Sequence, residues 1–144
     1  MILISHRGNI NGKDISRENH PSYIDEAIQT GYDVEIDIWV KDNTPILGHD
    51  IAQYEISYNW IKTRQDKLWI HCKNLLAIEW LASYPNFNYF WHQKDDLTIT
   101  SKGILWAYPG KQPIKNSVAV LPESFNDDLS QCIGICSDYI QNYK

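Results

Sequence analysis

Two acidic side chains, Glu35 and Asp37, alternate with the apolar residues Val34, Ile36 and Ile38. This alternation predicts a β-strand that carries both carboxylates on one face. Neighbouring carboxylates repel each other, so a pair that points into a core or cleft favours a divalent cation with oxygen ligands. A pair that points into water is an ordinary solvated face, and the two residues alone leave both interpretations open.

Other polar residues come directly after short apolar segments of the chain. The carboxyl ends of buried parallel strands are where α/β proteins place their functional sites. A histidine at a strand end can equally make one local hydrogen bond and do no chemistry. These residues are His6 and Arg7 after segment 2–4, His49 after segment 46–48, and His71 and Lys73 on one face of segment 67–73.

The segments that must position these residues follow a strand–helix–strand order. Residues 2–4 form an apolar run, a helix is predicted from Pro21 to its stop at Gly31, and the acidic strand comes next. This order predicts two parallel neighbouring strands. A helix over residues 55–63 and a second one after Asn74 are also expected. Further strands are predicted at 67–73, 88–92, 104–108, 118–121 and 132–136.

Composition restricts the class of protein. The chain has 144 residues and a net charge of -5, without a Lys/Arg stripe, which argues against nucleic-acid binding. Its length predicts one domain, residues 1–144. Three cysteines form no even framework, so reduced thiols are expected. The first apolar run is too short for a signal peptide and no segment is long enough to span a membrane, which predicts a cytoplasmic protein.

Taken together, the spaced motifs resemble the glycerophosphodiester phosphodiesterase family, within the wider group of phosphatidylinositol-phospholipase-C-like phosphodiesterases. The similar segments span residues 2 to about 73, and Gly134–Asp138 is similar to the last strand of that family. The motifs that carry the resemblance are His6-Arg7-Gly8, Glu18-Asn19, Glu35-x-Asp37, His49-Asp50 and Lys73.

The resemblance implies a fold and an activity. The implied fold is a small, reduced TIM-type (β/α) barrel of the α/β class, mostly parallel, with about seven strands and several outer helices missing. The implied activity is metal-dependent hydrolysis of a glycerophosphodiester or related small-molecule phosphodiester. The implied roles are acid/base catalysis by His6 and His49, substrate binding by Arg7, Lys73 and Glu18, and ligation of one divalent cation (Mg²⁺, Ca²⁺ or Mn²⁺) by Glu35, Asp37 and His71. Trp106 is a further candidate for substrate binding because it lies near the end of a predicted strand, and plain packing is the alternative for it.

Two departures from the family keep a second interpretation open. The family has an acidic ligand where this chain has His71, and the chain is far shorter than a usual barrel. The alternative is a catalytically weak or inactive protein that binds a phosphate or phosphosugar. Missing outer helices would leave apolar strands uncovered, so we also expect a homodimer that packs through residues 88–121.

Overall fold

The structure is a computed structural model that describes residues 1–144, and strands dominate it. Ten strands belong to one sheet, with three α-helices and three 3₁₀ turns between them. The strands are β1 (Ile2–His6), β2 (Asp33–Lys41), β3 (Thr44–Leu47), β4 (Tyr54–Glu55), β5 (Leu68–Cys72), β6 (Asn88–Trp91), β7 (Leu97–Ile99), β8 (Leu105–Ala107), β9 (Ser117–Val120) and β10 (Gly134–Ser137). The helices are α1 (Pro21–Thr30), α2 (Tyr58–Lys62) and α3 (Leu75–Ala82), and the 3₁₀ turns are η1 (Gln65–Lys67), η2 (Pro122–Ser124) and η3 (Ile140–Tyr143).

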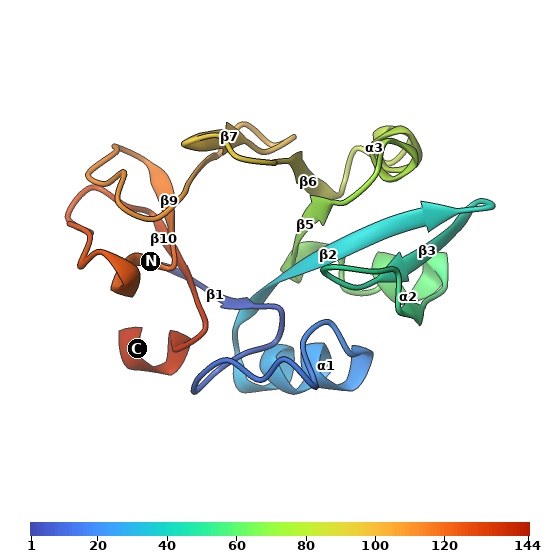
Figure 1. Ribbon diagram of the computed structural model, residues 1–144, viewed down its shortest axis with the longest axis horizontal. Helices are drawn as coiled ribbons and strands as arrows, with labels where there is room; N and C mark the ends of the chain where they lie inside the picture. Colours follow the sequence, from blue (N-terminus) through green and yellow to red (C-terminus); the bar gives the residue numbers. More distant parts are fainter.

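The sheet is mixed and curled (Figure 1). Its central path runs β6-β5-β2-β1-β10-β9-β8, and every neighbouring pair along this path is parallel. Strand β7 pairs antiparallel with β8, while β3 and β4 form an antiparallel extension on β2. No ladder joins β6 to β7, so the sheet is a curled half-barrel and not a closed one.

The prediction of a reduced TIM-type (β/α) barrel is therefore wrong. The seven predicted strands are present and parallel, but three more strands pair antiparallel, and only three short α-helices are formed. In a (β/α) barrel each strand is followed by an outer helix. Here no α-helix follows β6, because the links of residues 92–104, 108–116 and 121–133 contain only β7, turns and the short η2. Figure 1 shows α1, α2 and α3 gathered beside the first half of the chain.

The helix predictions were correct at α1 and α3, and the third predicted helix is present but shorter than expected. The imidazole of His20 caps the start of α1 by accepting a hydrogen bond from the Ser22 backbone amide. Gly31 ends this helix in a left-handed backbone conformation. Asn74 caps α3 in the same way through the Ala77 amide. The predicted helix 55–63 is shorter, because residue 55 pairs in β4 and only Tyr58–Lys62 are helical. None of the helices has the length and hydropathy needed to cross a membrane.

The strands bury different residues on their two faces. Outside the curl, Val34, Ile36 and Ile38 of β2 pack beneath α1 and α3 in the larger apolar cluster. Inside the curl, a second apolar cluster includes Trp69 and Trp106, whose stacked rings lie 5.6 Å apart between centroids. Because side chains alternate along a strand, the acidic residues of β2 point inward above this second cluster. The fold thus places a polar site on an apolar floor.

Candidate functional site

A cavity of about 520 Å³ opens at the carboxyl ends of the parallel strands. Its lining combines titratable and aromatic side chains. Most residues singled out in the sequence reach it: His6, Arg7, Glu35, His49, His71, Lys73 and Trp106 line the cavity. Two do not line it: Asp37 is fully buried beneath it, and Glu18 lies behind Arg7.

A tight turn after β1 sets the position of Arg7. Both Arg7 and Gly8 have a positive φ, of 57° and 96°. A Cβ at Gly8 would lie 2.6 Å from Cδ2 of Tyr23, so only glycine fits between this turn and α1. The turn directs the guanidinium back over β2, where Nε lies 3.0 Å from Asp37 Oδ2.

Register explains how the acidic pair meets a histidine. Asp37 of β2 is the pairing partner of His71 on β5, and Glu35 lies two residues earlier on the same inner face. His71 Nδ1 lies 3.1 Å from Asp37 Oδ1, and the donor atoms of the three residues lie within 4.8 Å of one another. Glu35 Oε2 and Asp37 Oδ1 are buried and have no hydrogen-bond partner. These unpartnered oxygens beside a ring nitrogen fit the donor set of one divalent cation.

The two carboxyl groups respond oppositely to this environment. Burial raises the pKa of Glu35 well above its ordinary value, and the charge of Asp37 adds to the rise more than Arg7 offsets it. Burial also opposes ionisation of Asp37, but its polar and charged neighbours, Arg7 among them, outweigh burial and hold the Asp37 pKa well below its ordinary value. Asp37 is therefore the fixed anion of the site, while Glu35 is the carboxyl that a bound cation would help to ionise.

Arg7 is surrounded by carboxylates. Burial opposes its charge, but Asp37, Glu35, Glu18 and Asp138 raise its pKa above the usual value. Glu18 Oε1 lies 3.6 Å from Arg7 Nη1 and is absent from the cluster around Asp37. This placement fits a residue that orients the guanidinium.

Asn19 holds Asp37 from behind with two hydrogen bonds. Its side-chain Nδ2 donates to Asp37 Oδ2 at 2.9 Å, and its Oδ1 accepts from the Asp37 backbone amide at 2.9 Å. The residue is 1% exposed and has a left-handed φ of 64°. Asparagine accepts this backbone conformation more readily than most residues, which explains why it can occupy the turn and clamp the carboxylate.

Replacing Asn19 should therefore destabilise the fold strongly. We expect Asn19→Ala to lower the free energy of unfolding by about 2 to 4 kcal/mol, since it removes a hydrogen bond from a buried carboxylate and leaves the buried Asp37 amide unpaired. Asn116 is the matched control: it has a φ of 60° but is exposed, so Asn116→Ala should cost only about 1 kcal/mol of backbone strain. Urea unfolding followed by circular dichroism gives both values. Equal losses in the two variants would contradict the clamp.

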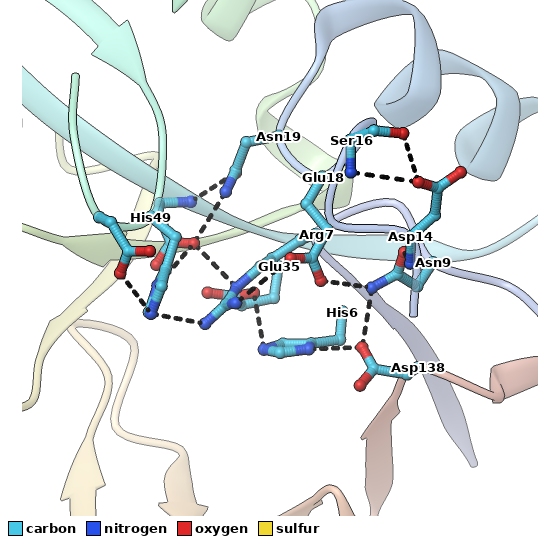
Figure 2. Close-up of polar contacts among 12 residues, drawn as sticks. His6, Arg7, Asn9, Asp14, Ser16, Glu18, Asn19, Glu35, His49 and Asp138 are labelled. Carbon is cyan, nitrogen blue, oxygen red and sulfur yellow. Dashed lines mark hydrogen bonds and ion pairs between the residues drawn. The ribbon is translucent and has the colours of Figure 1, made fainter. Parts of the chain in front are cut away.

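His6 is oriented by the far end of the chain (Figure 2). Its Nδ1 lies 2.7 Å from Asp138 Oδ1, and its Nε2 lies 3.7 Å from Glu35 Oε2. A carboxylate accepts, so Nδ1 donates and the neutral ring leaves Nε2 unprotonated toward the cavity. Burial opposes ionisation of Asp138, but the hydrogen bonds from His6 and from Asn9 lower its pKa.

A second group of potential ligands, His6, Glu18 and Asp138, is already satisfied. The side-chain amide of Asn9 donates to Glu18 Oε2 at 2.7 Å and to Asp138 Oδ1 at 2.9 Å. The amide thus occupies the position between the carboxylates where a cation would have to lie. Asn9 itself is fully buried and fixed by Tyr23, whose hydroxyl donates to its Oδ1. We interpret this group as a scaffold for His6.

His49 reaches the site from the loop that follows β3. Its Nε2 lies 3.4 Å from Arg7 Nη2, and its Nδ1 lies 3.5 Å from Asp37 Oδ2. The preceding Gly48 is required, because a Cβ there would lie 1.9 Å from the Ile51 carbonyl oxygen. The His49 side chain is 38% exposed, in contrast to the 11% of His6. The two histidines therefore flank Arg7 with different access to water.

Aromatic side chains also line the cavity. Trp39, Trp91, His92 and Tyr108 line it, and the rings of His92 and Tyr108 stack with centroids 3.5 Å apart. Trp106 is only 1% exposed and packs mainly in the floor. Its predicted substrate contact is thus limited to the base of the cavity.

Comparison with protein-family models gives no match, and comparison with curated proteins gives none either. The resemblance to glycerophosphodiester phosphodiesterases consequently remains a prediction from the motifs.

Proposed function

We propose that the protein is a metal-dependent phosphodiesterase that acts on a small glycerophosphodiester or related phosphodiester. The observation that carries this proposal is the convergence of His6, Arg7 and His49 on one cavity, directly above Asp37 and Glu35. Acid, base, cation and anion are the groups that the proposed cleavage requires, and here three separate segments supply them: the end of β1, strand β2 and the loop after β3.

His6 is the proposed general base. Asp138 accepts from Nδ1, which leaves Nε2 free to take a proton from the attacking hydroxyl or water. The carboxylate also stabilises the imidazolium that forms when the proton arrives. Asn9 fixes Asp138, so the ring is held ready before the substrate binds.

His49 is the proposed general acid. It lies across Arg7 from His6 and is more exposed, so it can regain a proton from solvent after giving one to the leaving group. Arg7 and Lys73 are the proposed phosphate ligands. Lys73 lines the cavity without an ion-pair partner, and its ammonium can therefore bind a non-bridging oxygen without breaking an existing pair.

The residues that would hold the divalent cation are Glu35, Asp37 and His71. When bound there, the cation would polarise a phosphoryl oxygen and neutralise developing charge. The chain itself contributes the buried carboxyl groups of Glu35 and Asp37, whose unpartnered oxygens favour a cation over water.

Two cavities meet at Arg7 and His49. The aromatic cavity lies on one side, and a more polar cavity of about 490 Å³, which includes Lys13, Glu18 and Gln53, lies on the other. A phosphate placed between these cavities would direct its two ester arms into different surroundings. We therefore propose an unsymmetrical diester with one polar arm and one arm that packs on aromatic rings.

The test is hydrolysis of bis(p-nitrophenyl) phosphate and of a glycerophosphodiester panel by metal-depleted protein, with and without added Mn²⁺. We expect turnover that depends on Mn²⁺ and disappears on chelation. Absence of turnover on every substrate, with tight binding of inorganic phosphate, would instead favour the second candidate, a phosphate-binding protein. That candidate draws support from Arg7, whose guanidinium is already engaged by Asp37 and Glu18 before any substrate binds.

A homodimer in the cytoplasm remains our proposal for the state of the protein. None of the three cysteines is paired, as expected in a reducing compartment. Strand β7 carries Leu97 and Ile99 at 38% and 59% exposure within the predicted interface.

Light scattering at micromolar concentration tests the dimer. We expect a mass of twice the 16.8 kDa monomer, because pairing would cover these side chains. We also expect Ile99→Lys to shift the protein to monomers, whereas the control Ile15→Lys, at an exposed residue outside 88–121, should leave the dimer intact. A monomeric mass for the unaltered protein would refute the proposal.

A further inference from the structure

His71 makes a contact that fixes which of its two nitrogens carries hydrogen. Its Nε2 lies 3.1 Å from the backbone carbonyl oxygen of His92. A carbonyl oxygen can only accept, so Nε2 must be the donor. The neutral ring is therefore the Nε2–H tautomer, and its lone pair belongs to Nδ1.

The ring cannot easily turn to present its other edge. It stacks on Phe90 with centroids 5.1 Å apart and planes 15° from parallel. The His92 carbonyl, which accepts the hydrogen bond from His71, belongs to a residue that is itself held in place. His92 Nε2 donates a hydrogen bond to the Asp95 carbonyl oxygen at 2.7 Å, and the His92 ring stacks on Tyr108. Residues of three strands and their loops thus direct His71 Nδ1 toward the acidic pair.

An unprotonated Nδ1 beside two carboxylates is an unfavourable arrangement without a cation. Nδ1 lies 3.1 Å from Asp37 Oδ1, yet that oxygen has no hydrogen-bond partner, so a proton on Nδ1 would not point at it. Glu35 Oε2 is likewise buried and unpartnered. Three electron-pair donors therefore face one another within 4.8 Å.

We infer that His71 is a neutral nitrogen ligand and that this centre prefers borderline transition metals such as Co²⁺ or Zn²⁺ to Mg²⁺ and Ca²⁺. Imidazole nitrogen suits the transition metals, whereas Mg²⁺ and Ca²⁺ favour sites made of oxygen alone. The hydrogen bond to the His92 carbonyl acts as the outer contact that metal-binding histidines commonly make, since it sets both the tautomer and the ring orientation. This inference rests on the proposed metal-dependent function and specifies the class of its cation.

The first experiment measures binding of Co²⁺ and of Mg²⁺ to the metal-depleted full chain by calorimetry. His71→Glu restores an all-oxygen ligand set, and His71→Gln removes the ligand nitrogen while keeping a polar side chain. We expect the ratio of Co²⁺ to Mg²⁺ affinity to fall at least tenfold in His71→Glu, and Co²⁺ affinity to fall about 10- to 100-fold in His71→Gln. An unchanged ratio in a folded His71→Glu variant would overturn the inference.

The second experiment needs no variant. Nitrogen-15 NMR of the unaltered protein saturated with Zn²⁺ should show His71 as a neutral ring with hydrogen on Nε2. An imidazolium at His71 in the saturated protein would overturn the inference. A ring protonated on both nitrogens has no lone pair for the metal ion and would itself neutralise the charge of the neighbouring carboxylate. Both readouts are independent of turnover: metal selectivity without hydrolysis would refute only the proposed activity, while hydrolysis with an unchanged metal ratio would refute only the role of His71.

Discussion

Replacement of His6 by alanine should reduce kcat for phosphodiester hydrolysis by about 10²- to 10⁴-fold, the usual contribution of a positioned acid or base. The ring contributes its Nε2 to the cavity and keeps it unprotonated through Asp138. Little loss of stability is expected, because the side chain ends at the cavity and is not packed in either large apolar cluster. Steady-state kinetics and circular dichroism provide the two measurements.

Two further variants test the specificity of this result. Asp138→Asn retains the size of the side chain but removes the charge that supports His6, so kcat should fall less than in His6→Ala while KM changes little. His20→Ala is the matched control, since His20 lies outside the cavity and serves as the cap of α1. A His6→Ala variant that retains most of the rate, or a His20→Ala variant that loses as much, would remove His6 from the mechanism.

Glu35→Gln should make the metal-free protein more stable. The same substitution should abolish turnover in the presence of Mn²⁺. Burial and the neighbouring Asp37 raise the pKa of Glu35, so its ionised form is unfavourable in the metal-free fold. A neutral side chain of the same shape should increase the free energy of unfolding by about 1 to 3 kcal/mol at neutral pH. The same change removes a cation ligand, so the stabilisation by Mn²⁺ and the turnover should both be lost.

The pH dependence gives this prediction a sign. A carboxyl group whose folded pKa is raised favours the fold below its unfolded pKa and loses that contribution as pH rises through the folded pKa. The advantage of Glu35→Gln should therefore grow with pH above the ordinary range of glutamate. Glu79→Gln, at an exposed residue of α3, should show no such trend. A Glu35→Gln variant less stable than the unaltered protein at neutral pH would show that the carboxylate is not strained.

The strands and much of the site could be predicted from local sequence. The period of two in β2 predicted Glu35 and Asp37 on one face and Ile36 on the other, and the structure has this arrangement with the acidic face inward. The caps of α1 and α3 could be predicted as well, because Pro21, Gly31 and Asn74 act within one turn of chain. Local signals of this kind depend on neighbouring residues alone.

The barrel prediction failed because it came from the resemblance and not from the links between strands. Residues 92–104 barely reach the length of a helical crossover and have no helical pattern, and they contain the antiparallel strand β7. Residues 55–63 illustrate a different limit. Their apolar spacing predicted one helix from residue 55. Glu55 instead pairs with Ile46 in the β3–β4 ladder, so the helix begins only at Tyr58.

The supporting side chains were harder to find than the reactive ones. Asn9 has no sequence signal beyond following Gly8, although it joins Glu18 to Asp138 across most of the chain length. The bond from His71 to the His92 carbonyl depends on the pairing of β5 with β6, which no local pattern specifies. Long-range contacts of this kind determine what the predicted residues can do.

The most direct test of the account is a crystal structure of the protein grown with Mn²⁺ and inorganic phosphate, with anomalous scattering to locate the ion. We predict an anomalous peak bounded by Glu35, Asp37 and His71, with phosphate beside it in contact with Arg7 and between the rings of His6 and His49. A cavity that contains neither ion nor phosphate at millimolar concentrations of both would contradict the account.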